Sequence, residues 1–284
     1  MNIPKFWARG KKIVTGAGNR KFDVLSWQWS DLSVEDALQK AEARVAIIAE
    51  KILRGETLDR YGYSDRPLRE EIKESIQTPF HNEVGVVTRN AYGALVLNSI
   101  SAMFIDIDIP ETAKPRKPGW FGGGGKDTPV ADKYLPSVQK VEAWSGMHPE
   151  YGIRIYATFA GLRCLIVNAV FDPKSDKALG ILNELQSDPL YVRLCKAQEC
   201  FRARLTPKPW RSGVHEPRDR YPWENPRVEA NYRQWEKQYD AATSKYSTCR
   251  LLKQLGAPDI HPDVEPILSY HDRVTRVESN LPLA

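Results

Sequence analysis

The chain has 284 residues, of which 42% are hydrophobic and 27% charged, with a formal net charge of +5. This balance excludes an intrinsically disordered chain and leaves length for one large domain or two modest ones with a packed core. No apolar run is long enough to cross a membrane, and the first residues lack the apolar segment of a signal peptide. Because four cysteines are few for a disulfide-stabilised secreted protein, we expect reduced thiols, a cytoplasmic location and no membrane partner.

The first segment predicts a β-hairpin followed by a helix. Apolar and polar residues alternate over 11–14 and 22–29, and a glycine-containing turn at 16–19 joins them. Ser33, with an acid three residues later, favours a helix start, and apolar residues at helical spacing follow it until Gly55. We expect this hairpin-helix element, within residues 1–80, to pack on the core of the protein.

The next segment, 84–110, predicts a meander of three strands. The third strand carries two acids, Asp106 and Asp108, within an otherwise apolar run. Since side chains alternate along a strand, both carboxylates leave the same face, where they repel each other. A divalent cation such as Mg²⁺, which prefers one or two carboxylates and substrate phosphates, would neutralise them. The alternative is a strand end whose acids simply face water.

Further along, the sequence predicts a helix over 136–147, a second hairpin over 152–168 and a helix from Ser175. Aromatic residues at helical spacing over 228–239 predict a later helix within a helical C-terminal segment. His271 and Asp272 have no partner pair elsewhere in the sequence, so we expect them to be structural or exposed. The spacing of the cysteines is not typical of a zinc site.

A basic segment precedes this helical tail. Residues 193–220 contain eight lysines and arginines against three acids. Arg202 and Arg204 alternate with apolar residues, so on a strand both guanidinium groups share a face. Arginine suits bidentate phosphate contacts, Lys208 adds a point charge, and Trp210 can stack on a base. This pattern favours a phosphate or nucleic-acid partner over the alternative, an exposed basic strand paired with surface acids.

The order of these features resembles the core of archaeo-eukaryotic-type primases and primase-polymerases. The matching features are the Asp-x-Asp strand at 104–109, a hairpin turning on a glycine at 158–163, an acid at 188 and a basic strand leading to Lys-Pro at 201–209. They cover about 84–215, under half of the chain. The chain also resembles a family of bacterial proteins that share segments equivalent to 61–71, 200–211 and 281–284, a likeness that carries no functional implication.

The primase resemblance implies an α+β fold with an RRM-like antiparallel palm at 84–215, and we expect the helical C-terminal segment, 216–284, to form a cap on it. It implies that Mg²⁺ or Mn²⁺ binds at the two strand acids. The implied catalytic residues are Asp106, Asp108 and Asp188, and the implied nucleotide- and nucleic-acid-binding residues are Arg163, Arg202, Arg204, Lys208, Trp210 and Arg211. The family has a histidine where this chain has Arg163, which can still hold a phosphate.

Three functional hypotheses follow from these patterns. The first is a metal-dependent nucleotidyltransferase of DNA replication or repair, which acts on nucleotides and on single-stranded or template nucleic acid. The second is a non-catalytic nucleic-acid-binding protein that uses the basic strand. The third is an interaction protein whose acids and bases form an ordinary surface.

Overall fold

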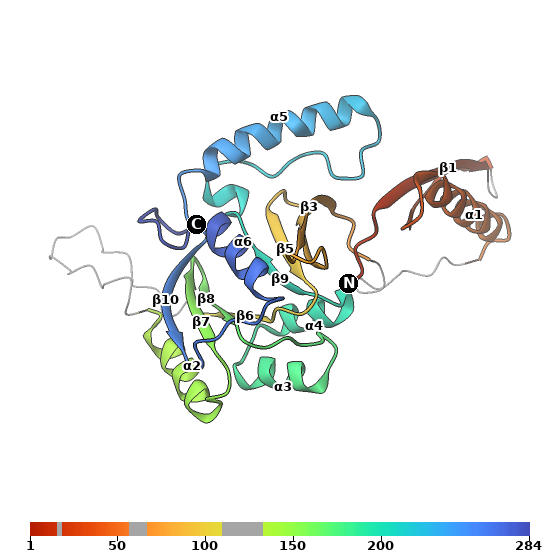
Figure 1. Cartoon of the computed structure of the whole chain (residues 1–284). Helices are drawn as coiled ribbons and strands as arrows, with labels where there is room; N and C mark the ends of the chain where they lie inside the picture. The colour runs from red at the N-terminus through yellow and green to blue at the C-terminus, as the bar shows by residue number, and fades with distance from the viewer. Residues whose placement is uncertain (16–18, 57–66, 110–132) are drawn as a thin grey trace, which may run out of the picture.

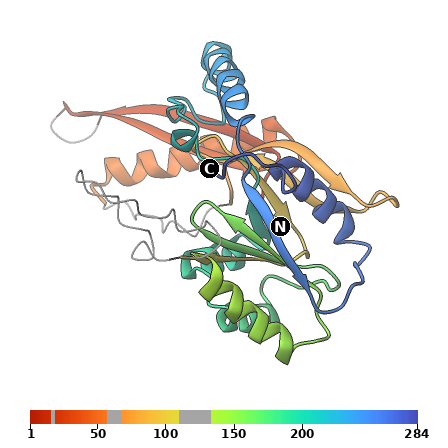
Figure 2. The same ribbon diagram turned by 90° about the vertical axis from the view of Figure 1, so that its left-hand side faces the viewer.

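The chain folds as an α+β protein, as the sequence predicts. The computed structural model describes residues 1–15, 19–56, 67–109 and 133–284, so most of the turn predicted at 16–19 lies outside them. The described residues form a two-stranded hairpin and two four-stranded antiparallel sheets, which pack with helices (Figure 1). The hairpin lies outside the two larger sheets, as Figure 2 also shows. None of the described helices is long and apolar enough to span a membrane.

The N-terminal unit consists of strands β1 (Phe6–Thr15) and β2 (Lys21–Ser30) and helix α1 (Val34–Leu53). Ser33 Oγ accepts a hydrogen bond from the backbone N–H of Asp36 at 3.2 Å, which confirms the predicted helix start. The helix packs on one side of the hairpin around a small apolar core of its own. The other side of the hairpin carries tryptophan and basic side chains and is not covered by this helix.

The first large sheet has the strand order β3-β4-β5-β9. Its strands are β3 (Glu71–Gln77), β4 (Glu83–Arg89), β5 (Leu95–Ser99) and β9 (Phe201–Arg204). The last of these comes from the basic segment, and it pairs antiparallel with β5 so that Arg202 lies opposite Asn98. This pairing confirms that Arg202 and Arg204 lie on a strand.

The second large sheet has the strand order β10-β7-β8-β6. Its strands are β6 (Phe104–Asp108), β7 (Ile153–Thr158), β8 (Gly161–Ile166) and β10 (Cys249–Leu255). The predicted meander is therefore wrong at its third strand, because β6 pairs with β8 instead of β5. The edge of β5 is occupied by β9, a pairing between distant segments that local sequence patterns do not specify.

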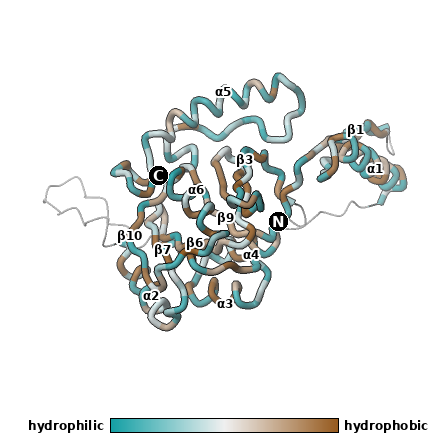
Figure 3. The backbone as a smooth tube through the Cα atoms, in the orientation of Figure 1, coloured by the Kyte–Doolittle hydropathy of each residue, from teal (hydrophilic) through white to brown (hydrophobic). Residues whose placement is uncertain are grey.

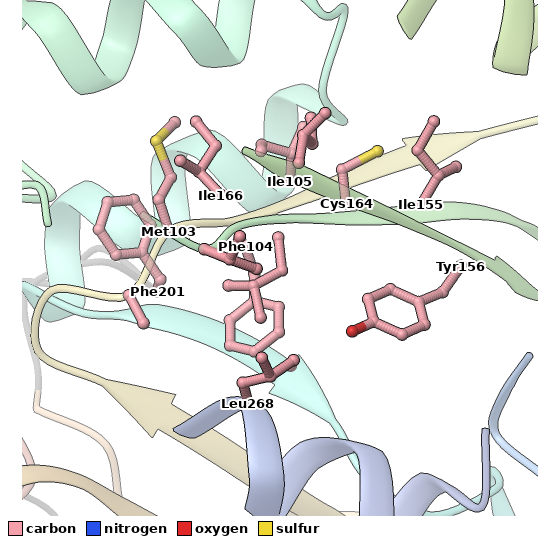
Figure 4. Packing of buried hydrophobic residues seen from close by; sticks show 14 of the residues in the cluster. Met103, Phe104, Ile105, Ile155, Tyr156, Cys164, Ile166, Phe201 and Leu268 are labelled. Carbon is pink, nitrogen blue, oxygen red and sulfur yellow. The ribbon is translucent and has the colours of Figure 1, made fainter. Parts of the chain in front are cut away.

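Both faces of strand β6 are buried. Phe104 points toward β9 and helix α6 (Glu265–Thr275), near Phe201 and Leu268, whereas Ile105 lies on the opposite side of the sheet (Figure 4). The two large sheets and their helices thus share one apolar core. Burial on both faces explains why this strand is apolar at every position before its acidic end.

The remaining helices are α2 (Leu135–Met147), α3 (Asp176–Glu184), α4 (Pro189–Gln198) and α5 (Pro226–Thr243). Helix α5 is mostly hydrophilic, whereas the strands of the second sheet are largely hydrophobic (Figure 3). The segment predicted as a helical cap, 216–284, contains α5 and α6 and also strand β10, which pairs with β7. Residues of this segment therefore complete the sheet that carries the acidic strand.

Candidate functional site

The two strand acids lie at the end of β6, beside strand β8. Asp106 is opposite Arg163 in the register, and Asp108 is opposite Gly161. A Cβ atom on Gly161 would lie 2.0 Å from the backbone oxygen of Ile107, so only glycine allows the two strands to approach this closely. Arg163 Nε donates a hydrogen bond to Asp106 Oδ1 at 3.3 Å. The buried guanidinium of Arg163 therefore neutralises part of the carboxylate charge that the sequence interpretation leaves to a metal ion.

Arg163 is held in place by a buried polar cluster. Its Nη1 donates to the backbone oxygen of Arg204 at 2.8 Å and lies 3.4 Å from both Cys249 Sγ and His271 Nε2. The other ring nitrogen of His271 lies 2.8 Å from Asp272 Oδ1. Burial alone would lower the pKa of Arg163, but the neighbouring Cys249 and Asp106 groups raise it above its ordinary value. Arg163 is therefore a permanent cation beneath the acids.

The sequence interpretation missed two members of this cluster. Cys249 and His271 are both fully buried, whereas the sequence left His271 as a structural or exposed residue without a partner. The dipeptide of His271 and Asp272 was the available signal, since an acid beside a histidine commonly fixes its orientation. Only the pairing of β10 with β7 and the docking of α6 bring the cluster behind Arg163.

The third predicted acid, Asp188, lies close to the first two. Its backbone N–H donates to the backbone oxygen of Asp106 at 2.9 Å. Its carboxylate caps helix α4 by accepting hydrogen bonds from the N–H groups of Leu190 at 3.0 Å and Tyr191 at 3.3 Å. Burial raises the pKa of Asp108, and the Asp188 and Asp106 carboxylates raise it further. The fold thus gathers all three acids, although Asp188 also has a structural role.

The carboxylates of Asp106 and Asp108 are the candidate ligands for a metal ion. Carboxylate oxygens are the ligands that Mg²⁺ and Mn²⁺ take in proteins. Within the described residues, no group of three or more histidine, cysteine, aspartate or glutamate side chains could hold a metal ion. Asp106 and Asp108 nevertheless suit an ion that keeps waters and takes its remaining ligands from substrate phosphates, as Mg²⁺ commonly does. The residues present therefore fit a metal that binds together with a phosphorylated substrate.

Three cations of the basic segment face these acids. Burial lowers the pKa of Lys208, and the Arg204 and Arg211 charges lower it further, more than the acids Asp108 and Asp106 raise it. Burial and the Arg204 charge likewise lower the pKa of Arg211 to about 10. Among the described residues, none of the three cations forms an ion pair, and Arg211 Nη1 is buried without a hydrogen-bond partner. Mutual repulsion and an unpaired donor are typical of a site for an anion.

Arg202 differs from its neighbours on the same segment. Its Nη2 donates to both carboxylate oxygens of Glu70, at 2.9 and 3.0 Å, and the two side chains are almost fully buried. Thr88 Oγ1 donates to the same carboxylate at 2.5 Å. Most of the Arg202 charge is therefore used inside the protein, and only Nη1 lacks a partner.

Two aromatic side chains lie next to the cations. Trp210 belongs to a 3-10 turn, Pro209–Arg211, and is 50% exposed. Its ring centroid lies 5.7 Å from that of Tyr92, and Lys208 Nζ lies 5.5 Å from the Trp210 centroid. The exposed Trp210, with the half-buried Tyr92 beside it, can stack on a base while the neighbouring cations bind phosphate. Tyr92 was not among the predicted site residues.

One cavity of about 1160 Å³ brings these residues together. Its lining includes nine arginines and lysines against five carboxylates, so it is a predominantly cationic space. Every predicted site residue except Trp210 lines it, namely Asp106, Asp108, Arg163, Asp188, Arg202, Arg204, Lys208 and Arg211.

No family model, no curated protein and no solved structure matches the chain.

Proposed function

We propose that this protein is a metal-dependent nucleotidyltransferase that binds a nucleoside triphosphate in the cavity and acts on single-stranded or template nucleic acid. The observation that carries the proposal is one cavity lined both by the acids Asp106 and Asp108 and by the cations Arg204, Lys208 and Arg211, which form no ion pair among the described residues. A nucleotide with its metal ion interacts favourably with both sets of charges at once, because it is a polyanion that carries divalent cations.

Each residue has a role in this proposal. Lys208, Arg204 and Arg211 bind the phosphates of the nucleotide, and Trp210 stacks on its base. Asp106 and Asp108 hold Mg²⁺ or Mn²⁺, which when bound stabilises the charge that develops on the attacking and leaving oxygens. Among the remaining predicted residues, Asp188 adds negative charge beside the metal ligands, and Arg163 fixes the orientation of Asp106.

The strand order supports the likeness to a primase-type, RRM-like palm. Strands β6, β8 and β7 lie side by side and antiparallel, and helix α2 connects the first to the last. This arrangement is the split β-α-β unit with which an RRM-like sheet begins. The fourth strand, β10, pairs with β7 at the far edge, whereas an RRM-like sheet adds it beside the first strand. Because the fourth strand lies at a different edge, we give the RRM-like palm only as part of the proposal.

A second candidate function is nucleic-acid binding without catalysis. Two observations support this second candidate. Arg163 already forms an ion pair with Asp106, and both oxygens of Asp188 already accept backbone hydrogen bonds. A protein that has lost the reaction but kept the basic residues of the cavity would show this arrangement.

The four free cysteines agree with a cytoplasmic location for either function.

Metal and nucleotide titrations separate the two functions. For the transferase, Mn²⁺ with a nucleoside triphosphate raises the melting temperature more than either alone, and Asp108→Asn abolishes that cooperative increase. A primer-extension assay with the same variant then tests the reaction itself. Asp259→Asn, a change at an exposed acid outside the cavity, is the matched control. Oligonucleotide binding with no response to Mn²⁺ and no extension would leave binding as the function.

A further inference from the structure

The cavity continues from the acids and cations to the N-terminal unit. Trp7 of β1 and Trp27 of β2 line this second end, together with Arg193 of α4 and Arg220. A smaller adjoining pocket of about 390 Å³ shares Trp27 and Arg220 with it. The hairpin, which the primase resemblance does not cover, thus forms a wall of the same cavity.

Buried hydrogen-bond donors line this second end without partners. Trp7 is only 8% exposed, and its Nε1 has no hydrogen-bond partner among the described residues. Arg202 Nη1 is likewise buried without a hydrogen-bond partner among the described residues, although Nη2 of that side chain donates to Glu70. A buried donor without a partner costs free energy, and nearly all such groups in folded proteins are satisfied by protein, water or ligand. These donors therefore call for a ligand with acceptor oxygens or nitrogens.

Two arginines at this end have no acidic partner among the described residues. Arg193 and Arg220 are exposed, and neither forms an ion pair within the parts of the chain that the structure describes. Arg233, which does not line the cavity, is by contrast paired with Glu71. Unpaired arginines that follow one cavity are the pattern of a backbone-tracking nucleic-acid groove.

Trp27 provides a fixed aromatic wall at this end. The guanidinium carbons of Arg9 and Arg69 lie 5.8 and 5.6 Å from its ring centroid. Arg9 also forms an ion pair with Glu224, which ties the hairpin to the segment before α5. The hairpin is thereby held against the groove through contacts between distant segments.

We infer that the second end binds several nucleotides of a single nucleic-acid strand, which runs from the acid–cation end to the N-terminal hairpin. The inference rests on the proposed function, since this strand is the one on which the transfer site would act. A single strand exposes base edges, sugars and phosphates that can accept from Trp7 Nε1 and Arg202 Nη1. A duplex keeps the Watson–Crick edges of its bases paired and offers acceptors only in its grooves and on its backbone.

The test measures fluorescence anisotropy of labelled oligodeoxythymidylates of about four and about twelve nucleotides, site sizes within the range of single-strand grooves. The double variant Arg193→Gln/Arg220→Gln is expected to weaken binding of the longer strand about tenfold and to lower its salt dependence by about two phosphate contacts. The shorter strand should lose far less. Arg273→Gln, an exposed arginine of α6 that lines neither pocket, is the matched control.

A conservative variant tests the buried donor. Trp7→Phe keeps an aromatic ring but removes the N–H, and it is expected to weaken binding of the longer strand roughly two- to tenfold, as the loss of one hydrogen bond predicts. Unchanged melting temperature would show that the hairpin remains folded. Equal affinity of all variants for the longer strand, or tighter binding of a duplex than of the single strand, would overturn the inference.

The outcome is separable from that of the proposed function. If Asp108→Asn and Lys208→Ala leave binding of nucleoside triphosphate with Mn²⁺ unchanged, the transfer site is wrong, whatever the longer strand does. If those variants abolish nucleotide binding while Trp7→Phe and the double variant bind the longer strand normally, the transfer site stands and the strand path is wrong.

Discussion

At the scale of single residues, Arg202 and Arg204 have different roles although they alternate on one strand. Arg202 is almost fully buried against Glu70, whereas Arg204 has no carboxylate partner in the described chain. We expect Arg202→Ala to destabilise the protein by about 3–5 kcal/mol, because it leaves a buried carboxylate unpaired. Arg204→Ala should change stability far less and weaken nucleotide binding instead. Urea denaturation and nucleotide titration of both variants measure these effects, and similar stability losses would contradict this division.

Lys208 supports a prediction about pH. Its pKa lies below the ordinary value of 10.5, because the site is partly buried and contains two other cations. The protonated amine binds phosphate, so nucleotide affinity is full below this lowered pKa and decreases as pH rises through it. Nucleotide titrations between about pH 7 and about pH 10 measure this decrease. Lys208→Arg should make the decrease smaller, because a guanidinium stays charged to a higher pH than an amine. A flat profile in the wild type would contradict the role of Lys208.

At the scale of elements, Asp188 has two roles at the start of helix α4. Its carboxylate caps the helix and also adds charge next to Asp108. Asparagine is an equally good cap without the charge, so Asp188→Asn should preserve stability, whereas Asp188→Ala should cost about 1 kcal/mol. If Asp188 acts as a third acid, both variants lose transferase activity. Full activity of Asp188→Asn would leave only the capping role.

The docking of α1 on the hairpin gives a second prediction at this scale. A Cβ atom on Gly10 would lie 2.6 Å from the backbone oxygen of Ala41, so the helix can approach the strand only at glycine. Gly10→Ala should destabilise the N-terminal unit by about 1–3 kcal/mol, as overpacking typically does. The same change at Gly146 in α2 meets nothing within 4 Å and should be neutral or stabilising. Thermal unfolding followed by circular dichroism compares the two.

At the scale of the whole molecule, the sheet that carries Asp106 and Asp108 depends on the C-terminal residues. Strand β10 pairs with β7, and Ile267 and Leu268 of α6 belong to the shared core. Phe104 and Tyr156 also lie against His271, with ring centroids 5.2 and 5.0 Å apart. We therefore expect a chain that ends at residue 215 to fail to fold. A cooperative thermal transition of that truncated chain, similar to that of the full chain, would contradict this expectation.

Local sequence patterns encode the secondary-structure elements and the chemical groups available at the site. Alternating apolar residues, the Ser33 cap and the acid pair of β6 are encoded over a few neighbouring residues, so periodicity and turn chemistry reveal them. The α+β class and the position of Asp106 and Asp108 at a strand end could be predicted for this reason.

Which of these elements lie side by side depends on the tertiary fold. The pairing of β9 with β5 and of β10 with β7, the cluster of Cys249 and His271 behind Arg163, and the burial of Arg202 on Glu70 all join segments far apart in the chain. Such contacts depend on the packing of a shared core, and no local pattern specifies them. Sequence therefore identified the cations and acids, and only the fold determined which of them stay unpaired inside one cavity.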